Sequence, residues 1–302
     1  MSCPDGTSPI DISLSSITGK CDYKCSYSFN YINSSCMITN RGDYLSILYD
    51  NSSSPPVVYN TLNYDVKEIR LYSPSLHSYS GNKTDGEFII VHNCITGAAP
   101  LLVCIPINTN NTTSISSMFF KTAIDTVADS APADGETTTV SISQFNLNDF
   151  VPKKPFFSYT ATEPYQPCST TVDFIVFDPL TISLDITSDS LSKLQSIIAN
   201  NGYDVKTGPN LFYNEKGPNI NNGGEIYIDC QPVGSSENTT EIISNISSNG
   251  TSSLKNFFKN PFFIFILFIL LFVIIMWGLK LLLNMFNVKT GGAASKTIIN
   301  NS

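Results

Sequence analysis

Short hydrophobic runs rich in Val, Ile, Phe and Tyr alternate with Gly, Pro, Asn and Asp over residues 1–230. Runs of this length, bounded by turn-forming residues, are typical of β-strands. The runs that predict strands are Val66–Tyr72, Glu87–Val91, Leu101–Ile107, Val172–Phe177 and Glu225–Ile228. The pattern therefore indicates a mostly β domain.

Two stretches in the same region predict short helices, Ser117–Thr126 and Ser188–Ala199. In the second stretch, apolar residues recur at the three- and four-residue spacing of one helix face. Together with the strands, these helices predict a single α+β domain over residues 1–230, and no internal repeat divides it.

One apolar stretch differs from the others in its length. Residues Pro261–Leu279 carry no charged side chain, and as a helix they would extend about 28 Å, close to the hydrocarbon thickness of a bilayer. We predict a transmembrane helix over residues 259–284 and a short polar tail over residues 285–302. Residues 231–258 are rich in Ser, Asn and Thr and cannot bury a core, so they predict a flexible stalk.

The first residues lack the basic and apolar regions of a signal peptide. We therefore expect a single span near the C-terminal end. Two lysines flank it on one side, Lys255 and Lys259, and three on the other, Lys280, Lys289 and Lys296. This difference is too small to fix the membrane orientation.

The acidic residues are unevenly distributed along the chain. All 25 precede the predicted span, against twelve basic residues up to position 250, which gives that part a net charge of −13. Nucleic-acid backbones are bound by clustered Lys and Arg, so this balance argues against a nucleic-acid partner. The sequence holds only two histidines, His77 and His92, which excludes a site built on three.

All eight cysteines also precede the predicted span: Cys3, Cys21, Cys25, Cys36, Cys94, Cys104, Cys168 and Cys230. An even number outside a membrane indicates disulfide bonds. A zinc site is the alternative, because Cys21 and Cys25 are closely spaced, but no second close pair completes a set of four ligands. We favour disulfides.

Asn-x-Ser/Thr sequons mark possible glycosylation sites at Asn33, Asn51, Asn82, Asn110, Asn111, Asn238, Asn245 and Asn249. A glycosylated surface domain would account for them. Chance is the alternative, since a chain rich in Asn, Ser and Thr generates sequons unaided.

Several blocks of sequence, in the same order as in a known family, cover most of residues 7–230. Thr7–Ile12 resembles the "SPIDI" opening of the α-carbonic anhydrases, and Ile38–Gly42 resembles their next strand. Glu68–His92 is similar to the block that carries the family's metal ligands. Asn146–Tyr159 and Tyr159–Val176 resemble the "LLP…YWTY" and "PPC" segments. The resemblance implies a large, twisted, mainly antiparallel sheet with short helices.

In that family three histidines hold a catalytic zinc, and the resemblance places Arg70, Tyr72 and Ile89 at their positions. Arginine is a permanent cation and isoleucine has no lone pair, so this set cannot hold a catalytic zinc. The resemblance therefore implies a domain with no metal, no other cofactor and no hydratase activity.

Other family positions are altered as well. The two threonines that orient the reacting groups fall on Pro164 and Tyr165, and the glutamate behind them falls on Leu76. His77 and His92 match family histidines that are not metal ligands, so we expect them to be hydrogen-bonded or packed in the strands.

The resemblance also implies two pairings. The cysteines that pair in secreted members correspond to Cys21 and Cys168. Arg70 would point into the former metal cavity, where Glu87 matches a family carboxylate, and a buried guanidinium needs an anion. We expect Arg70 and Glu87 to pair; in the alternative, Arg70 reaches solvent.

A domain of this kind, with a stalk and one C-terminal span, is similar to the cell-surface-binding envelope proteins of poxviruses. The resemblance implies a protein of the virion membrane, and of host membranes during assembly, that binds a glycan or protein on the host-cell surface. The charge of −13 argues against a sulfated glycan. The alternatives are a structural envelope or capsid-associated protein that docks to other viral proteins, and a residual enzyme. No ligand-binding residue is identified.

Overall fold

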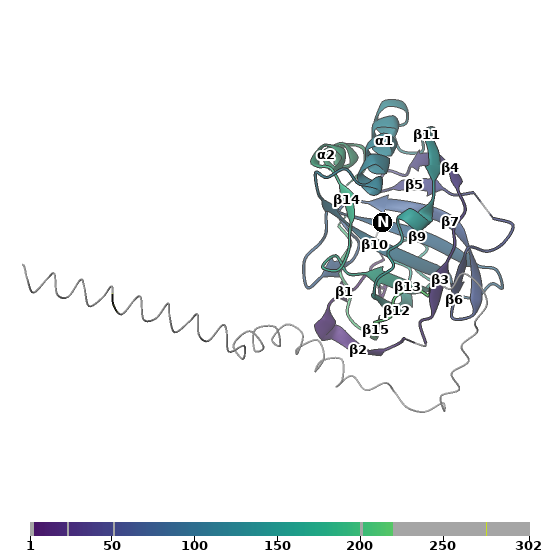
Figure 1. Ribbon diagram of the computed structural model, residues 1–302, viewed down its shortest axis with the longest axis vertical. Coiled ribbons are helices and arrows are strands. Elements are labelled where there is room, and N and C mark those ends of the chain that lie inside the picture. Colours follow the sequence, from purple (N-terminus) through teal and green to yellow (C-terminus); the bar gives the residue numbers. More distant parts are fainter. Residues whose placement is uncertain (1–2, 23, 51, 200–201, 220–275, 277–302) are drawn as a thin grey trace, which may run out of the picture. The chain divides into compact units, whose positions relative to one another are not determined.

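The protein is described by a computed structural model that covers residues 3–22, 24–50, 52–199, 202–219 and Met276. Its main feature is a 13-stranded twisted sheet (Figure 1). The central path of this sheet runs in the order β11 (Thr137–Phe145), β4 (Ser34–Asn40), β5 (Leu45–Leu48), β7 (Leu62–Tyr72), β9 (Gly86–Cys94), β10 (Leu101–Thr109), β13 (Thr171–Phe177), β12 (Phe156–Thr162), β15 (Leu211–Asn214) and β2 (Ile17–Lys20).

The remaining strands attach to this path. Strand β14 (Leu184–Ile186) pairs with β10, while β3 (Tyr27–Phe29) pairs with β6 (Val57–Tyr59), which in turn pairs with β7. A separate two-stranded sheet joins β1 (Asp11–Ile12) to β8 (Ser78–Tyr79). Most pairs are antiparallel; β10 with β13 and with β14, β15 with β2, and β1 with β8 are parallel.

Four short helical segments complete the described part: the 3-10 turns η1 (Leu14–Ser16) and η2 (Leu147–Asp149), and the helices α1 (Ile115–Ser130) and α2 (Ser188–Ile197). Helix α1 begins with a capping box, in which the Ser114 hydroxyl accepts from the Ser117 N–H and the Ser117 hydroxyl accepts from the Ser114 N–H. Helix α2 lies near β14, and α1 lies between α2 and β11 (Figure 1).

The sequence predicted the type of these elements correctly and their ends less well. The strands predicted at Val66–Tyr72, Glu87–Val91, Leu101–Ile107 and Val172–Phe177 are the cores of β7, β9, β10 and β13. Helix α1 is longer at both ends than the predicted Ser117–Thr126, and α2 ends two residues before the predicted Ala199. The resemblance implied a mostly β fold, and this is confirmed.

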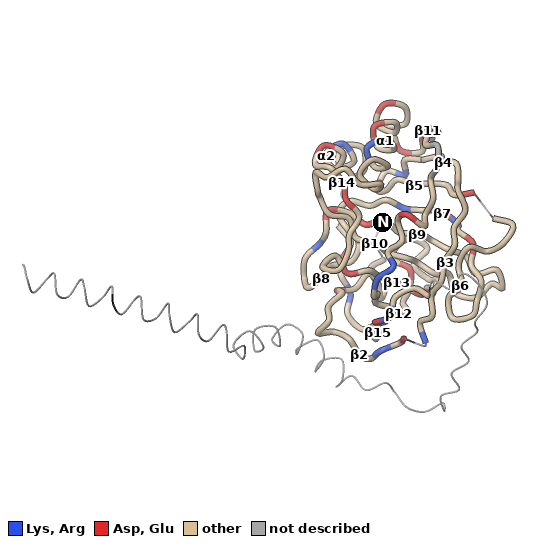
Figure 2. The backbone as a smooth tube through the Cα atoms, in the orientation of Figure 1, with Lys and Arg blue, Asp and Glu red and all other residues tan. Residues whose placement is uncertain are grey.

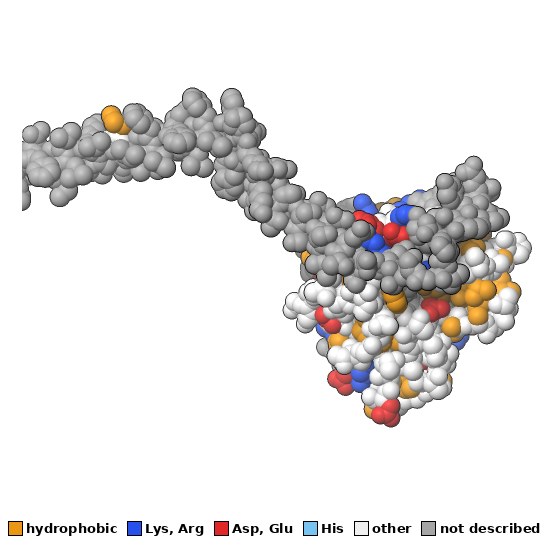
Figure 3. Space-filling view, turned by 90° about the horizontal axis from the view of Figure 1, so that it is seen from below, with side chains coloured by type: hydrophobic (Ala, Val, Ile, Leu, Met, Phe, Trp, Pro, Cys, Tyr) orange, Lys and Arg blue, Asp and Glu red, His pale blue; other side chains and the backbone are white. Residues whose placement is uncertain are grey.

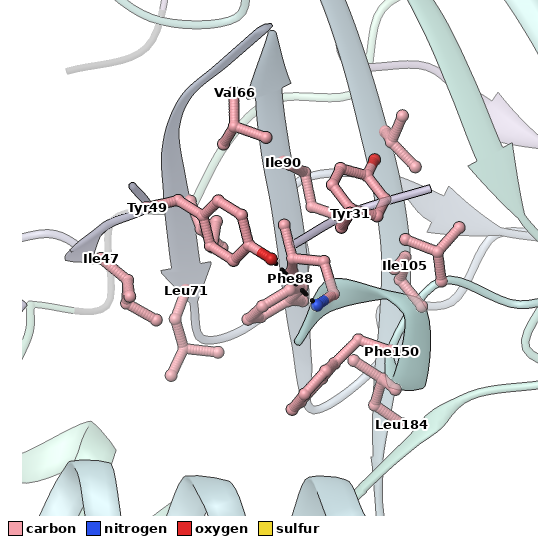
Figure 4. Packing of buried hydrophobic residues seen from close by; sticks show 14 of the residues in the cluster. Tyr31, Ile47, Tyr49, Val66, Leu71, Phe88, Ile90, Ile105, Phe150 and Leu184 are labelled. Carbon is pink, nitrogen blue, oxygen red and sulfur yellow. Dashed lines mark hydrogen bonds between the residues drawn. The ribbon is translucent and has the colours of Figure 1, made fainter. Parts of the chain in front are cut away.

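The hydrophobic core fills one face of the central strands. Side chains alternate along a strand, so Ile69 and Leu71 of β7 face this core, together with Phe88 and Ile90 of β9. Val66 faces it as well, because the register of β7 shifts between Val66 and Glu68. Figure 4 shows Val66, Leu71, Phe88 and Ile90 around the same core as Phe150 and Leu184. Helix α1 closes the core, where the ring of Phe119 stacks on that of Phe145 with 4.5 Å between centroids. The other face of β7 and β9 is thereby left for a different set of residues.

The disulfide pairing of Cys21 with Cys168 is wrong. Cys168 is bonded to Cys3, and Cys21 is bonded to Cys25. The N-terminal segment lies beside the end of β12, because the Thr7 N–H donates to the Thr162 hydroxyl at 2.8 Å. Cys3 is thus brought to Cys168, whereas the Cys21 N–H is held by a carbonyl of β15. The other described cysteines, Cys36, Cys94 and Cys104, are buried free thiols.

Several predictions fall on residues outside the described part. These are the strand Glu225–Ile228, the stalk at 231–258, the span at 259–284 apart from Met276, the tail at 285–302, and the sequons at Asn51, Asn238, Asn245 and Asn249. Among the described residues, no helix is long and apolar enough to cross a membrane.

Candidate functional site

The three positions that the sequence comparison assigned to metal-binding histidines lie together on two neighbouring strands. Strands β7 and β9 are antiparallel, and their register places Arg70 opposite Ile89 and Tyr72 opposite Glu87. Residues two apart on a strand share a face, so Arg70 and Tyr72 both point away from the main hydrophobic core. The candidate site is therefore the part of the sheet around Arg70.

The Arg70 guanidinium is held by a carboxylate from its own strand. Its Nε and Nη2 atoms donate to Glu68 Oε1 at 2.9 and 2.5 Å. Its Nη1 atom donates to the Tyr72 hydroxyl at 3.4 Å. The side chains of Arg70 and Glu68 are only 11% and 16% exposed, so this ion pair is largely shielded from solvent.

Two aromatic rings cover the same guanidinium. The Arg70 Cζ atom lies 3.7 Å from the ring centroid of Tyr165 and 4.7 Å from that of Tyr44. Both distances fall within the range of cation–π attraction. We call Tyr44, Glu68, Arg70, Tyr72 and Tyr165 the Arg70 cluster.

The charge state of the cluster follows from these contacts. Burial disfavours the guanidinium cation, but the surrounding tyrosine oxygens and the Glu68 carboxylate outweigh it, so the pKa of Arg70 lies above its ordinary value. Burial raises the pKa of the phenols of Tyr44, Tyr72 and Tyr165. The cluster therefore consists of one cation, one carboxylate and neutral phenols at neutral pH.

The cluster does not fit a zinc ion. Ile89 offers no donor atom, and the Tyr72 hydroxyl accepts from the Arg70 guanidinium. A divalent cation at these positions would meet a fixed positive charge that is already paired. Leu76, Pro164 and Tyr165, at the family's other reacting positions, are buried, and Leu76 forms hydrogen bonds only through its backbone, as a donor to Glu87 and an acceptor from Lys83.

The predicted pairing of Arg70 with Glu87 is wrong, because other donors saturate Glu87. Its Oε1 atom lies 2.6 Å from Nδ1 of His77, and its Oε2 atom accepts the backbone N–H groups of Leu76 and His77. The Tyr79 hydroxyl donates to Oε1 at 3.3 Å. Burial disfavours its charge, but His77 and the backbone N–H groups outweigh this, so the pKa of the Glu87 carboxyl is lowered.

This buried network also contains the one three-residue group of potential metal ligands in the described part, His77, Glu87 and Cys104. Both ring nitrogens of His77 are already engaged, Nδ1 with Glu87 and Nε2 with the Tyr159 hydroxyl at 2.7 Å. Burial raises the pKa of the Cys104 thiol well above its ordinary value. The His77 nitrogens and the Glu87 carboxylate are thus engaged in hydrogen bonds, and the Cys104 thiol stays protonated, so the group is better described as a core network than as a metal site.

The second histidine is likewise structural. His92 Nε2 lies 3.0 Å from the Tyr31 hydroxyl, and Nδ1 lies 3.2 Å from the Leu101 carbonyl, which can only accept. Nδ1 therefore carries the proton and Nε2 accepts from Tyr31. Burial lowers the pKa of His92 to about 4. The expectation that both histidines are hydrogen-bonded is confirmed.

A pocket of about 200 Å³ opens beside the Arg70 cluster. Its lining includes Lys67, Arg70, Asn93, Glu163 and Tyr165. The sequence reasoning missed Tyr44 and Glu68 as partners of Arg70. The contact with Glu68 could have been predicted, because residues i and i+2 of a strand lie on one face. The contact with Tyr44 could not, because Tyr44 lies outside the strand and no sequence spacing relates it to Arg70.

The described sequon residues Asn33, Asn82, Asn110 and Asn111 are all exposed. Glycosylation at these positions stays a prediction. Acidic and basic positions are interspersed over the domain (Figure 2), and on the face in Figure 3 they lie next to one another. On the face that Figure 3 shows, the described residues form no extended, uniformly basic patch.

A profile described as eukaryotic-type carbonic anhydrase matches residues 3–210 of the chain. The α-carbonic anhydrase of Thermovibrio ammonificans in complex with sulfanilamide is 16% identical, with a TM-score of 0.58 over 69% of this chain and 87% of that one. Carbonic anhydrase Cah3 of Chlamydomonas reinhardtii, in complex with acetazolamide, is 17% identical, with a TM-score of 0.59 over 70% of this chain and 91% of that one.

Dioscorin complexed with ascorbate is also 17% identical, with a TM-score of 0.60 over 70% of this chain and 87% of that one. A comparison with curated proteins found no match. At these identities, the structural similarities show the fold alone.

Proposed function

Since the chain belongs to the eukaryotic-type carbonic anhydrase family, we propose that it uses the family's fold as a binding module and not as a hydratase. The observation that carries this proposal is the Arg70 guanidinium, which is fixed by Glu68 and covered by two tyrosine rings. The positions where the family holds its metal are filled by a cation and its partners.

The chemistry of hydration supports the same conclusion. A zinc hydratase needs a metal that lowers the pKa of a bound water to about 7. Arg70, Tyr72 and Ile89 offer no set of lone pairs for such an ion. His77 and His92, the two histidines of the sequence, are committed to Glu87, Tyr159, Tyr31 and the Leu101 carbonyl.

The proposal includes a location and a role. The apolar stretch at residues 261–279 supports attachment to a membrane by one span. A metal-free domain presented from such an anchor acts through its surface. We propose a virion-membrane protein that binds a ligand on the host-cell surface, as the resemblance to poxvirus envelope proteins suggests.

A structural role, in which the domain docks to other viral proteins, is the second candidate. Met37 of β4 and Leu48 of β5 are paired across the two strands and are 38% and 46% exposed. Two large apolar side chains side by side on an open strand surface favour a protein contact.

The experiments address each part of the proposal. Stopped-flow CO₂ hydration by the full chain, with and without added zinc, should show no rate above the buffer; a zinc-dependent rate would contradict the proposal. Proteoliposomes carrying the full chain should adhere to host cells, and immunogold labelling should place the protein on intact particles. Co-purification with the capsid shell after detergent, without cell adhesion, would favour the structural role.

A further inference from the structure

Two pockets adjoin one another on the sheet next to the Arg70 cluster. The larger, of about 580 Å³, lies where β5, β7 and β9 meet, and its lining includes Asp50, Asp65, Lys67 and Asn93. The smaller is the pocket of about 200 Å³ beside Arg70, and it shares Lys67 and Asn93 with the larger one. We call the two together the β7–β9 groove. Its larger part is within the size range of small-ligand sites, ~300–1,000 Å³.

The groove contains two carboxylate oxygens that have no hydrogen-bond partner in the protein. Among the residues that the structure describes, the buried side-chain oxygens without a hydrogen-bond partner are Asp65 Oδ1 and Glu163 Oε1. Asp65 lines the larger pocket and Glu163 lines the smaller one. Both unpartnered oxygens of the described part therefore belong to this one surface.

Such an arrangement is unfavourable for the unliganded fold. A carboxylate oxygen that is removed from water without gaining a hydrogen bond destabilises the folded state. Proteins depart from full hydrogen bonding mainly at functional sites. Asp65 and Glu163 are each partly exposed and line the groove, although their unpartnered oxygens are themselves covered. A small rotation of either side chain would bring its unpartnered oxygen to a ligand donor without breaking a hydrogen bond of that oxygen within the protein.

The charges around these carboxylates narrow the class of ligand. Lys67 is exposed and borders both pockets, so its charge offsets part of the negative charge of the carboxylates. Asp50, Asp65 and Glu163 disfavour an anionic ligand, because like charges in a partly desolvated site repel. The positive charge of Arg70 is already paired with Glu68. An uncharged ligand that supplies hydrogen-bond donors meets no like charge in either pocket, so the groove suits such a ligand.

We propose that the β7–β9 groove binds a neutral carbohydrate, whose hydroxyl groups donate to the carboxylates of Asp65 and Glu163. Asn93 and Gln166, which are exposed and line the groove, supply amide groups that both donate to and accept from hydroxyls. This inference rests on the proposed binding function and names the ligand class of that surface.

The test uses the full chain in a detergent without a sugar headgroup. The labelled protein is applied to an array of neutral, sialylated and sulfated oligosaccharides, and affinity is then measured for the neutral oligosaccharide that binds best. The variants Asp65→Leu and Glu163→Met remove the acceptors while keeping side-chain size. Asp125→Leu is the matched control, because Asp125 is a carboxylate outside the groove that pairs with Lys121 and Lys193 at 2.7 and 2.6 Å.

We expect each groove variant to weaken binding of the neutral oligosaccharide at least tenfold without lowering the midpoint of thermal unfolding. The control variant should keep the affinity and lower the midpoint. Asp65→Asn and Glu163→Gln, which keep one acceptor oxygen, should give intermediate affinities. This combination separates a ligand role from a structural one, because removing a structural carboxylate would lower the stability of the protein.

Three results would overturn the inference: no binding to any neutral oligosaccharide, binding confined to sulfated or sialylated ones, or groove variants that bind as the unmodified protein does. Adhesion of proteoliposomes to cells before and after periodate oxidation of the cell-surface sugars separates this inference from the proposed function. Adhesion that persists after periodate treatment would refute the carbohydrate ligand but would remain consistent with the proposed binding function. Absence of adhesion to untreated cells would refute both.

Discussion

His92 makes the stability of the domain depend on pH in a defined window. Its ring is fully buried and neutral in the folded state, with a pKa of about 4, against an ordinary value of 6.5. Below about pH 6.5 the unfolded chain takes up a proton that the folded chain does not, so the unfolded state gains stability as pH falls. The loss continues until the folded pKa of about 4 is reached.

The size of the effect follows from the difference between the two pKa values. Each pKa unit corresponds to about 1.4 kcal/mol, so the free energy of unfolding should fall by about 2–3 kcal/mol between pH 7.5 and 4.5 from this residue alone. Urea unfolding followed by circular dichroism at several pH values across this range would measure it.

The variant His92→Gln isolates this contribution. Glutamine can still donate to the Leu101 carbonyl and accept from the Tyr31 hydroxyl, but it does not titrate. Carboxylates titrate in both proteins, so the difference between the two unfolding free energies reports His92. The free energy of unfolding of the unmodified protein, minus that of His92→Gln, should fall by about 2–3 kcal/mol from pH 7.5 to 4.5. A difference that stays constant over this range would show that His92 is not a neutral, desolvated group.

Three further predictions concern the cluster, the N-terminal disulfide and one glycine. Glu68→Gln leaves the Arg70 guanidinium without its carboxylate, and we expect the free energy of unfolding in urea to fall by about 2–3 kcal/mol. This is less than for a fully buried pair, because both side chains retain some exposure. The double variant Glu68→Leu with Arg70→Met should recover most of this loss, and no recovery would contradict the ion-pair account. Cys3→Ser opens a loop of 165 residues and should lower the free energy of unfolding by up to about 5 kcal/mol. Cys21→Ser opens a loop of only four residues and should lower it by about 2 kcal/mol. Equal shifts of the melting temperature would refute the assignment of the bonds. Gly86→Ala places a Cβ atom 2.7 Å from the Tyr72 carbonyl oxygen and should lower stability by at least about 1–3 kcal/mol, whereas Gly202→Ala, with open space around it, should not.

Part of the candidate site was predictable from the sequence, because it depends on which residues are present and on their spacing within short motifs. The side chains at the family's metal positions were identified from motifs, and the structure places Arg70, Tyr72 and Ile89 on neighbouring strands as that comparison implies. The structural role of His77 and His92 followed from the same motifs. The partner of Arg70 was assigned to the wrong glutamate, although Glu68 lies two residues away on the same face of β7.

The sequence alone determined the class of the fold, the approximate positions of its main strands and helices, and the residues available at the former metal positions, because hydrophobic periodicity and residue chemistry are local properties. Tertiary structure decided which carboxylate holds Arg70 and which cysteine is bonded to Cys168. It also decided that Asp65 and Glu163, each with one unpartnered carboxylate oxygen, line the same groove. These outcomes depend on distances between segments far apart in the chain. Such distances are set by strand register and by competition among many possible partners, and neither is encoded in the spacing of any one motif.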